Sequence, residues 1–366
     1  MKILYVTAKG GIHDYRFLKM LVRDYEVLLL HYAADELIDE IKSIRGLKIV
    51  SKKPWPVKSY PILSEKRHFK KIYDDFNPDI IHTGYVWQVG VLASHFNLHP
   101  HLSMVWGSDI LTEPDKSSYK KKLVDKVMKQ CDYIQCDAEV VKKKIMKDYD
   151  ISSEKITVFP WGIELNVFKK LDKSDCRKYL NLSPDNFIIV FTRYLEPVYG
   201  VSYMLEGFKK FAENKNDVML LMLSSGSLEI ETKKFISENH LESKIRLIKS
   251  IPNAELPRFL NAADIYISTS LSDGTSLSLL EAMASGLGLV VTGLPAINEW
   301  VNEENGFTVP PLNVDQVVSS LEIYYANRKL IESHGNKNIL IAHERADWDK
   351  NYLKLKEIYD KLLISY

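Results

Sequence analysis

Short apolar runs alternate with longer segments of helical periodicity along most of this 366-residue chain. The runs are rich in Ile, Val and Leu and are bounded by Gly, Asn or Asp, which is typical of strands buried on both faces of a parallel sheet. The pattern occurs twice, so we predict two parallel sheets covered by helices. The predicted strands are residues 2–8, 27–33, 47–52, 79–84, 101–107 and 133–138 in the first half, and 187–193, 218–226, 245–250, 264–270 and 287–293 in the second.

Residues 158–175 (VFPWGIELNVFKKLDKSD) separate the two series and combine a Pro-Trp-Gly break with a polar tail, which indicates a linker. A chain of this length also favours two domains over one core. We therefore expect Rossmann-like domains over residues 1–165 and 166–342, and a C-terminal helix over 343–366 that packs back across them. The predicted fold class is α/β, with two facing domains and a deep cleft between them. Ligands of such sheets bind outside the carboxyl ends of the strands, so the cleft is the expected site.

The composition is that of a soluble globular protein, with 46% hydrophobic residues, 27% charged residues and a formal net charge of +1. This balance gives no reason to expect nucleic acid as a partner. Cys131, Cys136 and Cys176 have no CxxC spacing, which is typical of a reduced chain. The first apolar run, residues 3–8, is short for a secretory signal, and no run approaches the ~18 residues of a membrane span. We expect a cytoplasmic protein.

Two lysine-dense segments, residues 116–130 and 140–150, stand out from this balanced charge. The simpler interpretation is that they are the solvated faces of helices. The alternative is a basic face of the first domain that rests on anionic lipid at the inner face of a membrane. Because neither segment has a strong aromatic or apolar anchor, any such peripheral contact would be weak and electrostatic.

The stretch SDGTSLSLLEAMASG, residues 272–286, follows a predicted strand and is expected to be a tight loop that leads into a helix. Glycine in the loop lets the backbone approach a ligand closely, and a helix N-terminus attracts anions. Glu281, inside the helix, could then accept two hydroxyls of a ribose. On the residues alone, Asp273 could equally fix a turn and Glu281 complement the helix dipole. The helix N-cap is predicted to be Thr275 or Ser276, and the anion-binding amides those of Gly274, Thr275, Ser276 and Leu277.

Residues 251–292 (IPNAELPRFLNAADIYISTSLSDGTSLSLLEAMASGLGLVVT) closely resemble the donor-binding signature of the retaining glycosyltransferases of family 4. These enzymes have the GT-B fold of two facing Rossmann-like domains. The resemblance implies transfer of a sugar from a nucleoside-diphosphate-sugar to an acceptor hydroxyl with retention of anomeric configuration. It implies no cofactor and no metal ion, and the family's commonest acceptors are carbohydrates or lipid-linked sugars of surface polysaccharides and glycolipids. Further matching stretches are residues 1–11, 105–111, 158–168, 191–208 and 298–311.

The resemblance also assigns donor-side roles. The family signature has two glutamates separated by seven residues, and Glu281 matches the second, which binds the ribose. Asp273 replaces the first, which lies near the transferred sugar, so we expect it to be catalytic. Arg193 matches the first of two basic residues that bind the diphosphate, where it would meet the charge that grows on the leaving group. Tyr199 stands where the second basic residue is usually Lys.

The acceptor-side candidates lie in the first half of the chain. Gly10 and Gly11 match the glycine pair at which the family's first domain meets the donor phosphate and the acceptor. Trp106 stands where many relatives have His, and Asp109 could orient an acceptor hydroxyl or could cap a helix. His13 either reaches the cleft or is solvated.

Two other functions remain open from the sequence. The chain could be a catalytically inactive GT-B scaffold or binding subunit, because the second basic residue is missing and Asp replaces Glu. It could also be a GT-B nucleotide-sugar epimerase, although such enzymes need an acid–base pair of carboxylates that we do not find. An NAD-dependent dehydrogenase is disfavoured because no GxGxxG follows a strand.

Overall fold

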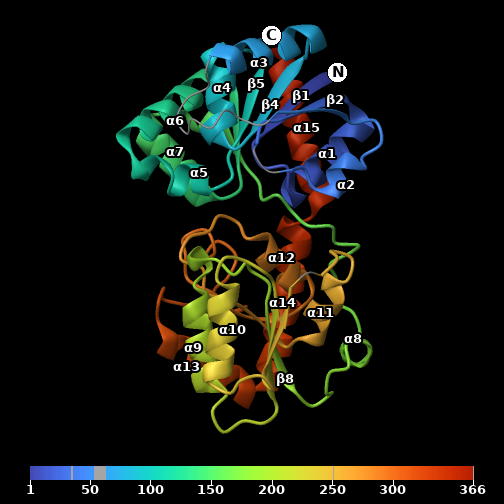
Figure 1. The fold of residues 1–366 in the computed structure, drawn as a ribbon, viewed down its shortest axis with the longest axis vertical. Coiled ribbons are helices and arrows are strands. Elements are labelled where there is room, and N and C mark those ends of the chain that lie inside the picture. The colour runs from blue at the N-terminus through green and yellow to red at the C-terminus, as the bar shows by residue number, and fades with distance from the viewer. Residues whose placement is uncertain (34–35, 53–62, 250, 366) are drawn as a thin grey trace. The chain divides into compact units, whose positions relative to one another are not determined.

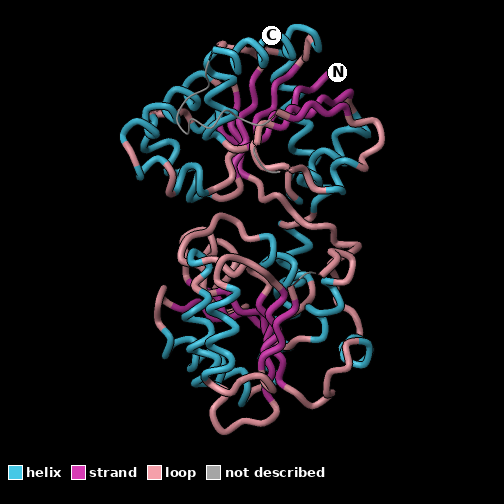
Figure 2. Tube along the Cα trace, viewed as in Figure 1, coloured by secondary structure: helices cyan, strands magenta, loops and turns pink. Residues whose placement is uncertain are grey.

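The computed structural model describes residues 1–33, 36–52, 63–249 and 251–365. The chain divides into two compact units: unit 1 is Met1–Phe159 with Tyr352–Tyr366, and unit 2 is Pro160–Asn351. In each unit the strands form one layer with helices on both sides (Figure 2). Within the described ranges, no helix combines the length and the apolar content that a bilayer crossing requires.

Unit 1 contains a parallel sheet of seven strands in the order β3-β2-β1-β4-β5-β6-β7. All six strands predicted for this half are confirmed. The short edge strand β7 was not predicted, because it lies where the linker was expected to begin. The strands are β1 (Lys2–Thr7), β2 (Glu26–His31), β3 (Lys48–Ser51), β4 (Ile80–Gly84), β5 (His101–Met104), β6 (Tyr133–Cys136) and β7 (Ile156–Val158).

Helices cover both faces of this sheet (Figure 1). One face packs on α3 and α4 through a core that includes Phe69 and Leu92. On the other face α15 lies beside α1, and the Tyr359 hydroxyl of α15 is 2.6 Å from His82 Nδ1 inside β4. Burial lowers the pKa of His82 to about 3, so the imidazole is neutral. The helices are α1 (Ile12–Asp24), α2 (Asp39–Lys42), α3 (Leu63–Phe76), α4 (Val91–His95), α5 (Ser108–Leu111), α6 (Ser118–Gln130), α7 (Glu139–Tyr149) and α15 (Trp348–Ile364), with short turns η1 (Val86–Gly90), η2 (Pro114–Lys116) and η3 (Ser153–Lys155).

Unit 2 contains a parallel sheet of six strands in the order β10-β9-β8-β11-β12-β13. The five strands predicted for this half are confirmed, although Ser250, at the end of one predicted strand, lies outside the described residues. The three-residue strand β13 was not predicted. The strands are β8 (Phe187–Phe191), β9 (Val218–Leu223), β10 (Ile245–Ile248), β11 (Ile265–Ser268), β12 (Gly288–Thr292) and β13 (Phe307–Val309).

The helices of unit 2 divide between the two faces of its sheet. α9, α10 and α13 enclose a large apolar core on one face, whereas α11, α12 and α14 lie together on the other (Figure 1). The helices are α8 (Lys173–Tyr179), α9 (Val201–Phe211), α10 (Glu229–Glu238), α11 (Leu256–Ala262), α12 (Leu277–Ala284), α13 (Val314–Ala326) and α14 (Arg328–Arg345), with the turn η4 (Pro197–Tyr199).

Both sheets reverse their strand order at one point, between β1 and β4 in unit 1 and between β8 and β11 in unit 2. Successive crossover helices leave to opposite faces at such a point, which opens a crevice at the carboxyl ends of the two central strands. Each unit therefore has one place where the fold itself favours a ligand. The residues that follow β1 and β4, and those that follow β8 and β11, border these two crevices.

Candidate functional site

In unit 2 the loop after β8 and the loop after β11 are joined directly. The Thr269 hydroxyl donates to the carbonyl oxygens of Tyr199 and Gly200 at 3.2 and 3.0 Å. Gly200 has φ +61°, and a Cβ at this position would overlap the Thr269 carbonyl oxygen. Only glycine combines this backbone conformation with so close an approach at low cost. The two loops therefore meet at the point where the strand order reverses.

Arg193 lies at the centre of this junction. Its Nη1 donates to Ser276 Oγ at 2.7 Å and to Ser278 Oγ at 3.1 Å. Its Nη2 lies 2.8 Å from Asp273 Oδ2, and the side chains of Arg193 and Asp273 are only 11% and 15% exposed. The guanidinium carbon lies 4.2 Å from the centroid of the Tyr199 ring. The structure thus brings together the cation of Arg193, the carboxylate of Asp273 and the aromatic ring of Tyr199.

A chain of hydrogen-bonded hydroxyls supports the guanidinium of Arg193. The Tyr266 hydroxyl lies 2.8 Å from Ser278 Oγ, which lies 3.0 Å from Ser276 Oγ. Tyr266 is fully buried in β11, so its ring is fixed by the core of the sheet. The hydroxyls therefore present oxygen acceptors to Arg193 in a preset position. Ser278 and Tyr266 were not predicted as site residues. Ser278 could have been noticed as a serine within the apolar helix LSLLEAMA, whereas nothing in the sequence distinguished Tyr266 from a core residue of its strand.

The electrostatics of the pair reflect its burial. Burial raises the pKa of the Asp273 carboxyl, and this outweighs the neighbouring Arg193 charge, which lowers it. Burial disfavours the charged form of Arg193, but Asp273 nearby raises the net pKa of the guanidinium, which stays protonated. Arg193 Nε is buried and has no hydrogen-bond acceptor among the described residues. A buried donor without an acceptor is costly, so this guanidinium retains capacity to bind an anion.

The helix that follows begins as predicted. Ser276 is its N-cap and accepts the N–H of Leu279 at 3.4 Å, which decides between the two predicted cap residues. Glu281 is only 6% exposed. Thr275 Oγ1 accepts the indole N–H of Trp300 at 3.4 Å, so the Thr275 hydroxyl oxygen already has a donor within the protein. A small cavity of about 10 Å³, room for roughly one water, lies beside the helix and is lined by Ser268, Ser270, Ser276, Leu279, Val291, Thr292 and Ile297.

In unit 1 the glycine pair lies between β1 and α1. Gly10 has φ +65°, a backbone conformation that favours glycine, and a Cβ there would also require the Leu37 side chain to shift. Gly11, the N-cap of α1, donates its N–H to Asp14 Oδ2 at 3.2 Å, while Asp14 Oδ1 accepts the Tyr5 hydroxyl at 3.0 Å. Burial raises the pKa of Asp14 to about 6. Asp14, which was not predicted, positions the glycine backbone.

Three predicted acceptor-side residues come together at the carboxyl ends of β4 and β5. The His13 and Trp106 rings meet edge to face with centroids 5.5 Å apart. Asp109 is fully buried, and its carboxylate accepts the N–H of Val86 at 2.9 Å and that of Trp106 at 3.0 Å. Burial raises the pKa of Asp109 to about 7. The helix α5 has Gly107 as its N-cap, so Asp109 joins two loops rather than capping that helix.

Tyr85, which was not predicted, is a further feature of this edge. It has φ +77°, a conformation that strains any side chain with a Cβ, and Lys9 Nζ lies 5.1 Å from the centroid of its ring. The next residue, Val86, donates its N–H to Asp109. The surrounding structure therefore holds a strained aromatic residue at the strand-order reversal of unit 1, where strain is often associated with ligand contact.

The lysine-dense segments are partly neutralised by local ion pairs. Lys116 and Lys120 both pair with Glu113, and Lys144 pairs with Asp115 and Asp148. Surface pairs of this kind are typical of solvated helix faces, the simpler of the two interpretations.

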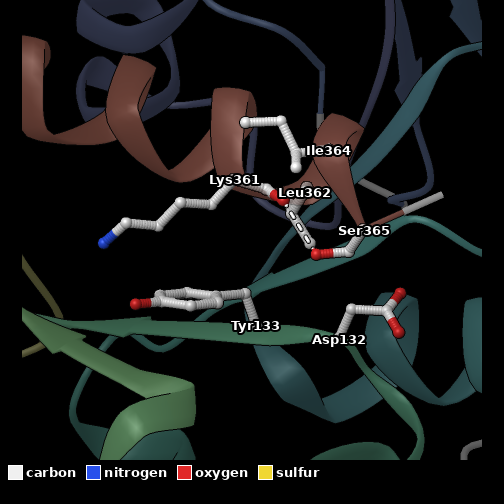
Figure 3. A pocket seen from close by; sticks show the side chains of 6 residues that line it. All are labelled: Asp132, Tyr133, Lys361, Leu362, Ile364 and Ser365. Carbon is white, nitrogen blue, oxygen red and sulfur yellow. Dashed lines mark hydrogen bonds between the residues drawn. The ribbon is translucent and has the colours of Figure 1, made fainter.

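A different pocket of unit 1, with a volume of about 560 Å³, contains no predicted site residue (Figure 3). It lies where β6 begins and α15 ends, so it is at the amino edge of the sheet rather than the carboxyl edge. At the edge of this pocket, Ser365 Oγ donates to the Lys361 carbonyl oxygen, four residues earlier in the chain, at 2.9 Å. Its lining is Asp132, Tyr133, Lys361, Leu362, Ile364 and Ser365.

Comparison with known families accounts for both halves of the chain. The family described as "Glycosyl transferases group 1" matches residues 172–339, and the family "Glycosyl transferase 4-like" matches residues 2–138. The first match contains the Arg193 junction and the second contains the glycine pair and Asp109.

Two relatives illustrate the similarity in sequence. The chain is 28% identical to the Escherichia coli UDP-Gal:alpha-D-GlcNAc-diphosphoundecaprenol alpha-1,3-galactosyltransferase over 185 residues, 49% of this chain and 48% of the enzyme. It therefore spans about half the length of that relative. It is also 21% identical to an uncharacterized glycosyltransferase of Methanocaldococcus jannaschii. That alignment spans 297 residues, which are 77% of this chain and 75% of the relative.

Solved structures agree over the full length. Sucrose-phosphate synthase from Thermosynechococcus elongatus has a TM-score of 0.83 at 15% identity, with 100% of both chains covered. Anabaena HepE in complex with UDP and glucose has a TM-score of 0.83 at 17% identity, with 99% of this chain and 100% of that chain covered. These likenesses show that the fold is GT-B, as predicted.

Proposed function

Because this chain belongs to the group 1 glycosyl transferases, we propose that it transfers a sugar from a nucleoside-diphosphate-sugar to an acceptor hydroxyl. The observation that carries the proposal is the position of Arg193. Its guanidinium is held by two serine hydroxyls at the strand-order reversal of unit 2, beside the N-terminus of α12. A fixed, always charged guanidinium next to a helix N-terminus is a site for a diphosphate.

Unit 2 binds the donor in this proposal. Glu281 accepts the ribose hydroxyls, Arg193 and the amides of residues 274–277 bind the diphosphate, and Asp273 lies by the transferred sugar. Glu281 is only 6% exposed in α12, and a carboxylate in such a place can accept charge-assisted hydrogen bonds from ribose hydroxyls. HepE was solved with UDP and with glucose, which supports a nucleotide and a sugar as ligands of this fold.

The reaction breaks the bond between the anomeric carbon and the diphosphate oxygen and forms a bond from that carbon to the acceptor oxygen. The acceptor proton passes to the departing phosphate on the same face, so the anomeric configuration is retained. Arg193 and the N-terminus of α12 stabilise the negative charge that grows on the leaving group. The protein supplies position and electrostatics, and no metal ion or cofactor takes part in the proposed reaction.

Unit 1 binds the acceptor in this proposal. Gly10 and Gly11 allow close approach of the backbone, and the His13 and Trp106 rings offer an apolar face with polar edges. Asp109 holds this loop through the Trp106 N–H, and we propose that it orients the acceptor by this route. The proposed acceptor is a carbohydrate or lipid-linked sugar of a surface polysaccharide or glycolipid. This choice is supported by the name of the Escherichia coli relative, which specifies a sugar linked to diphosphoundecaprenol.

We place the protein in the cytoplasm, at the inner face of the membrane when the acceptor is lipid-linked. Any contact with anionic lipid is weak, because several lysines of the basic segments are already ion-paired. Sedimentation with vesicles containing anionic lipid, at low and at physiological salt, tests this: binding that persists at physiological salt would contradict it.

The test of function has two steps. Thermal melting with UDP, GDP, ADP and dTDP identifies the nucleotide, because a ligand of the native state raises the melting temperature. The matching nucleotide-sugars are then assayed for slow release of free sugar, and by NMR for the anomer formed on an acceptor. Nucleotide binding without release or transfer would favour an inactive scaffold, release of an epimerised sugar would favour an epimerase, and no binding at all would refute the proposal.

A further inference from the structure

We propose that Asp273 makes the donor site of this chain favour an intact nucleotide-sugar over the nucleoside diphosphate that the transfer leaves behind. The inference rests on the proposed function and adds to it a residue that discriminates substrate from product. It comes from the direct pairing of Asp273 with Arg193, two side chains to which separate ligand groups are assigned.

The pairing places Asp273 in competition with a phosphate. Asp273 Oδ2 lies 2.8 Å from Arg193 Nη2, while both N–H groups of Nη1 are directed at Ser276 and Ser278. A phosphate oxygen that binds the guanidinium on the Asp273 side must therefore share Nη2 with the carboxylate or displace it. The side chain of Asp273 is only 15% exposed, so water is a poor substitute for the lost partner.

An intact nucleotide-sugar compensates for this loss. Its sugar hydroxyls can donate to the Asp273 carboxylate while the diphosphate takes the guanidinium, so both buried charges keep a partner. A nucleoside diphosphate brings no hydroxyl to this position. Its terminal phosphate also carries up to about one more negative charge near pH 7, by the second ionisation of a phosphate monoester. Asp273 therefore repels the product and leaves the substrate with its contacts complete.

The fixed position of Arg193 keeps a phosphate that it binds, through Nε or Nη2, close to the Asp273 carboxylate. Tyr266 supports Ser278, both serines hold Nη1, and the Tyr199 ring covers one face of the guanidinium. The cation therefore cannot turn toward a product phosphate without losing these contacts. Ser278 and Tyr266 are positioning residues in this arrangement, and Asp273 is the residue that discriminates.

The test is isothermal titration of native protein and of Asp273→Asn with UDP, UDP-glucose, UDP-galactose, UDP-GlcNAc and uridine; if another nucleotide stabilises the native chain, its diphosphate and sugars replace these probes. Asp273→Asn should bind UDP about tenfold more tightly, because the competing charge is removed. Its affinity for the preferred UDP-sugar should stay within about threefold or fall, and that for uridine should not change. Equal changes for UDP and for the UDP-sugar, or no change for either, would overturn the proposal.

Ser278→Ala serves as the matched control. It removes a partner of Arg193 without touching the carboxylate, so it should weaken UDP and the UDP-sugar by similar factors and leave their ratio as in the native chain. A change in that ratio equal to that of Asp273→Asn would assign discrimination to the position of Arg193 instead. Should Asp273→Asn melt far below the native chain, Asp273→Ser provides the same test with a smaller side chain.

The native chain offers a measurement that needs no variant. Tighter binding of UDP than of every UDP-sugar that the protein turns over would overturn the proposal directly. The proposed function and the proposed role of Asp273 can be refuted separately. A chain that binds no nucleotide refutes the proposed function, whereas a chain that transfers sugar while Asp273→Asn keeps the native ratio of UDP to UDP-sugar affinity refutes this inference alone.

Discussion

The guanidinium of Arg193 lies over the ring of Tyr199, with its carbon 4.2 Å from the ring centroid. Tyr199 occupies the position at which the family resemblance expects a second basic residue. The Arg193 guanidinium is thus supported by an aromatic face where we expected a second positive charge in the family pattern. The ring limits where the guanidinium can go, while leaving its N–H groups available in the plane.

The Tyr199 ring can be tested by two substitutions. Tyr199→Ala should weaken nucleoside diphosphate binding by about 0.5–1 kcal/mol, the usual size of a cation–π contact that retains some solvent. Tyr199→Phe keeps the ring face and should bind like the native chain in titration calorimetry. Equal losses in both variants would instead assign the effect to the hydroxyl.

Glu281 is expected to bind the ribose. Glu281→Ala should weaken nucleotide binding by about 1–3 kcal/mol, since a charge-assisted hydrogen bond to a hydroxyl is lost. Titration with the bare nucleoside isolates this contact because it lacks the diphosphate. Unchanged affinity for the nucleoside would return Glu281 to a role in complementing the helix dipole.

Arg193 should matter more for turnover than for binding of the nucleoside. In Arg193→Ala, we expect the rate of sugar transfer to fall at least about 100-fold, or 2.7 kcal/mol, because the leaving diphosphate loses its main cation. The affinity for the nucleoside should be preserved, and steady-state rates with matched calorimetry give both quantities. A rate within about twofold of native would place the diphosphate contact elsewhere.

Asp109 predicts a dependence of stability on pH. Its folded-state pKa is raised to about 7 by burial, so the folded protein holds a proton that the unfolded chain releases near pH 4. Folding then binds a proton between these values, and the stability from this group falls as the pH rises, by at most about 1.4 kcal/mol per pH unit.

The variant Asp109→Asn isolates this effect. Its amide can accept only one of the two backbone N–H groups of Val86 and Trp106, so it should melt below the native chain at pH 5. Because Asn does not ionise, the two melting temperatures should approach each other toward pH 8. A constant difference across this range would show that the carboxyl does not titrate there.

Much of the fold follows from local patterns in the sequence. Every strand predicted from an apolar run is present, because burial on both faces of a parallel sheet leaves an uninterrupted apolar segment that can be read without any partner. Ser276 as helix cap is equally local, since its hydroxyl bonds within one turn of its own helix. The strands that were missed, β7 and β13, have three residues each, and such a length carries too little pattern to be distinguished from a loop.

The pairing of the functional side chains depends on contacts between distant segments of the chain. Arg193 and Asp273 belong to different strand–loop units, and nothing in either segment specifies that one will lie 2.8 Å from the other. The same holds for Asp109, which could be read as a cap but is bound by an amide that follows a different strand. Local sequence is sufficient to specify which segments become strands and helices, and which residue types stand at their ends, because these features depend on periodicity over a few residues. Strand order determines which of those residues form ion pairs or hydrogen bonds with one another, and strand order is set by the packing of the whole sheet.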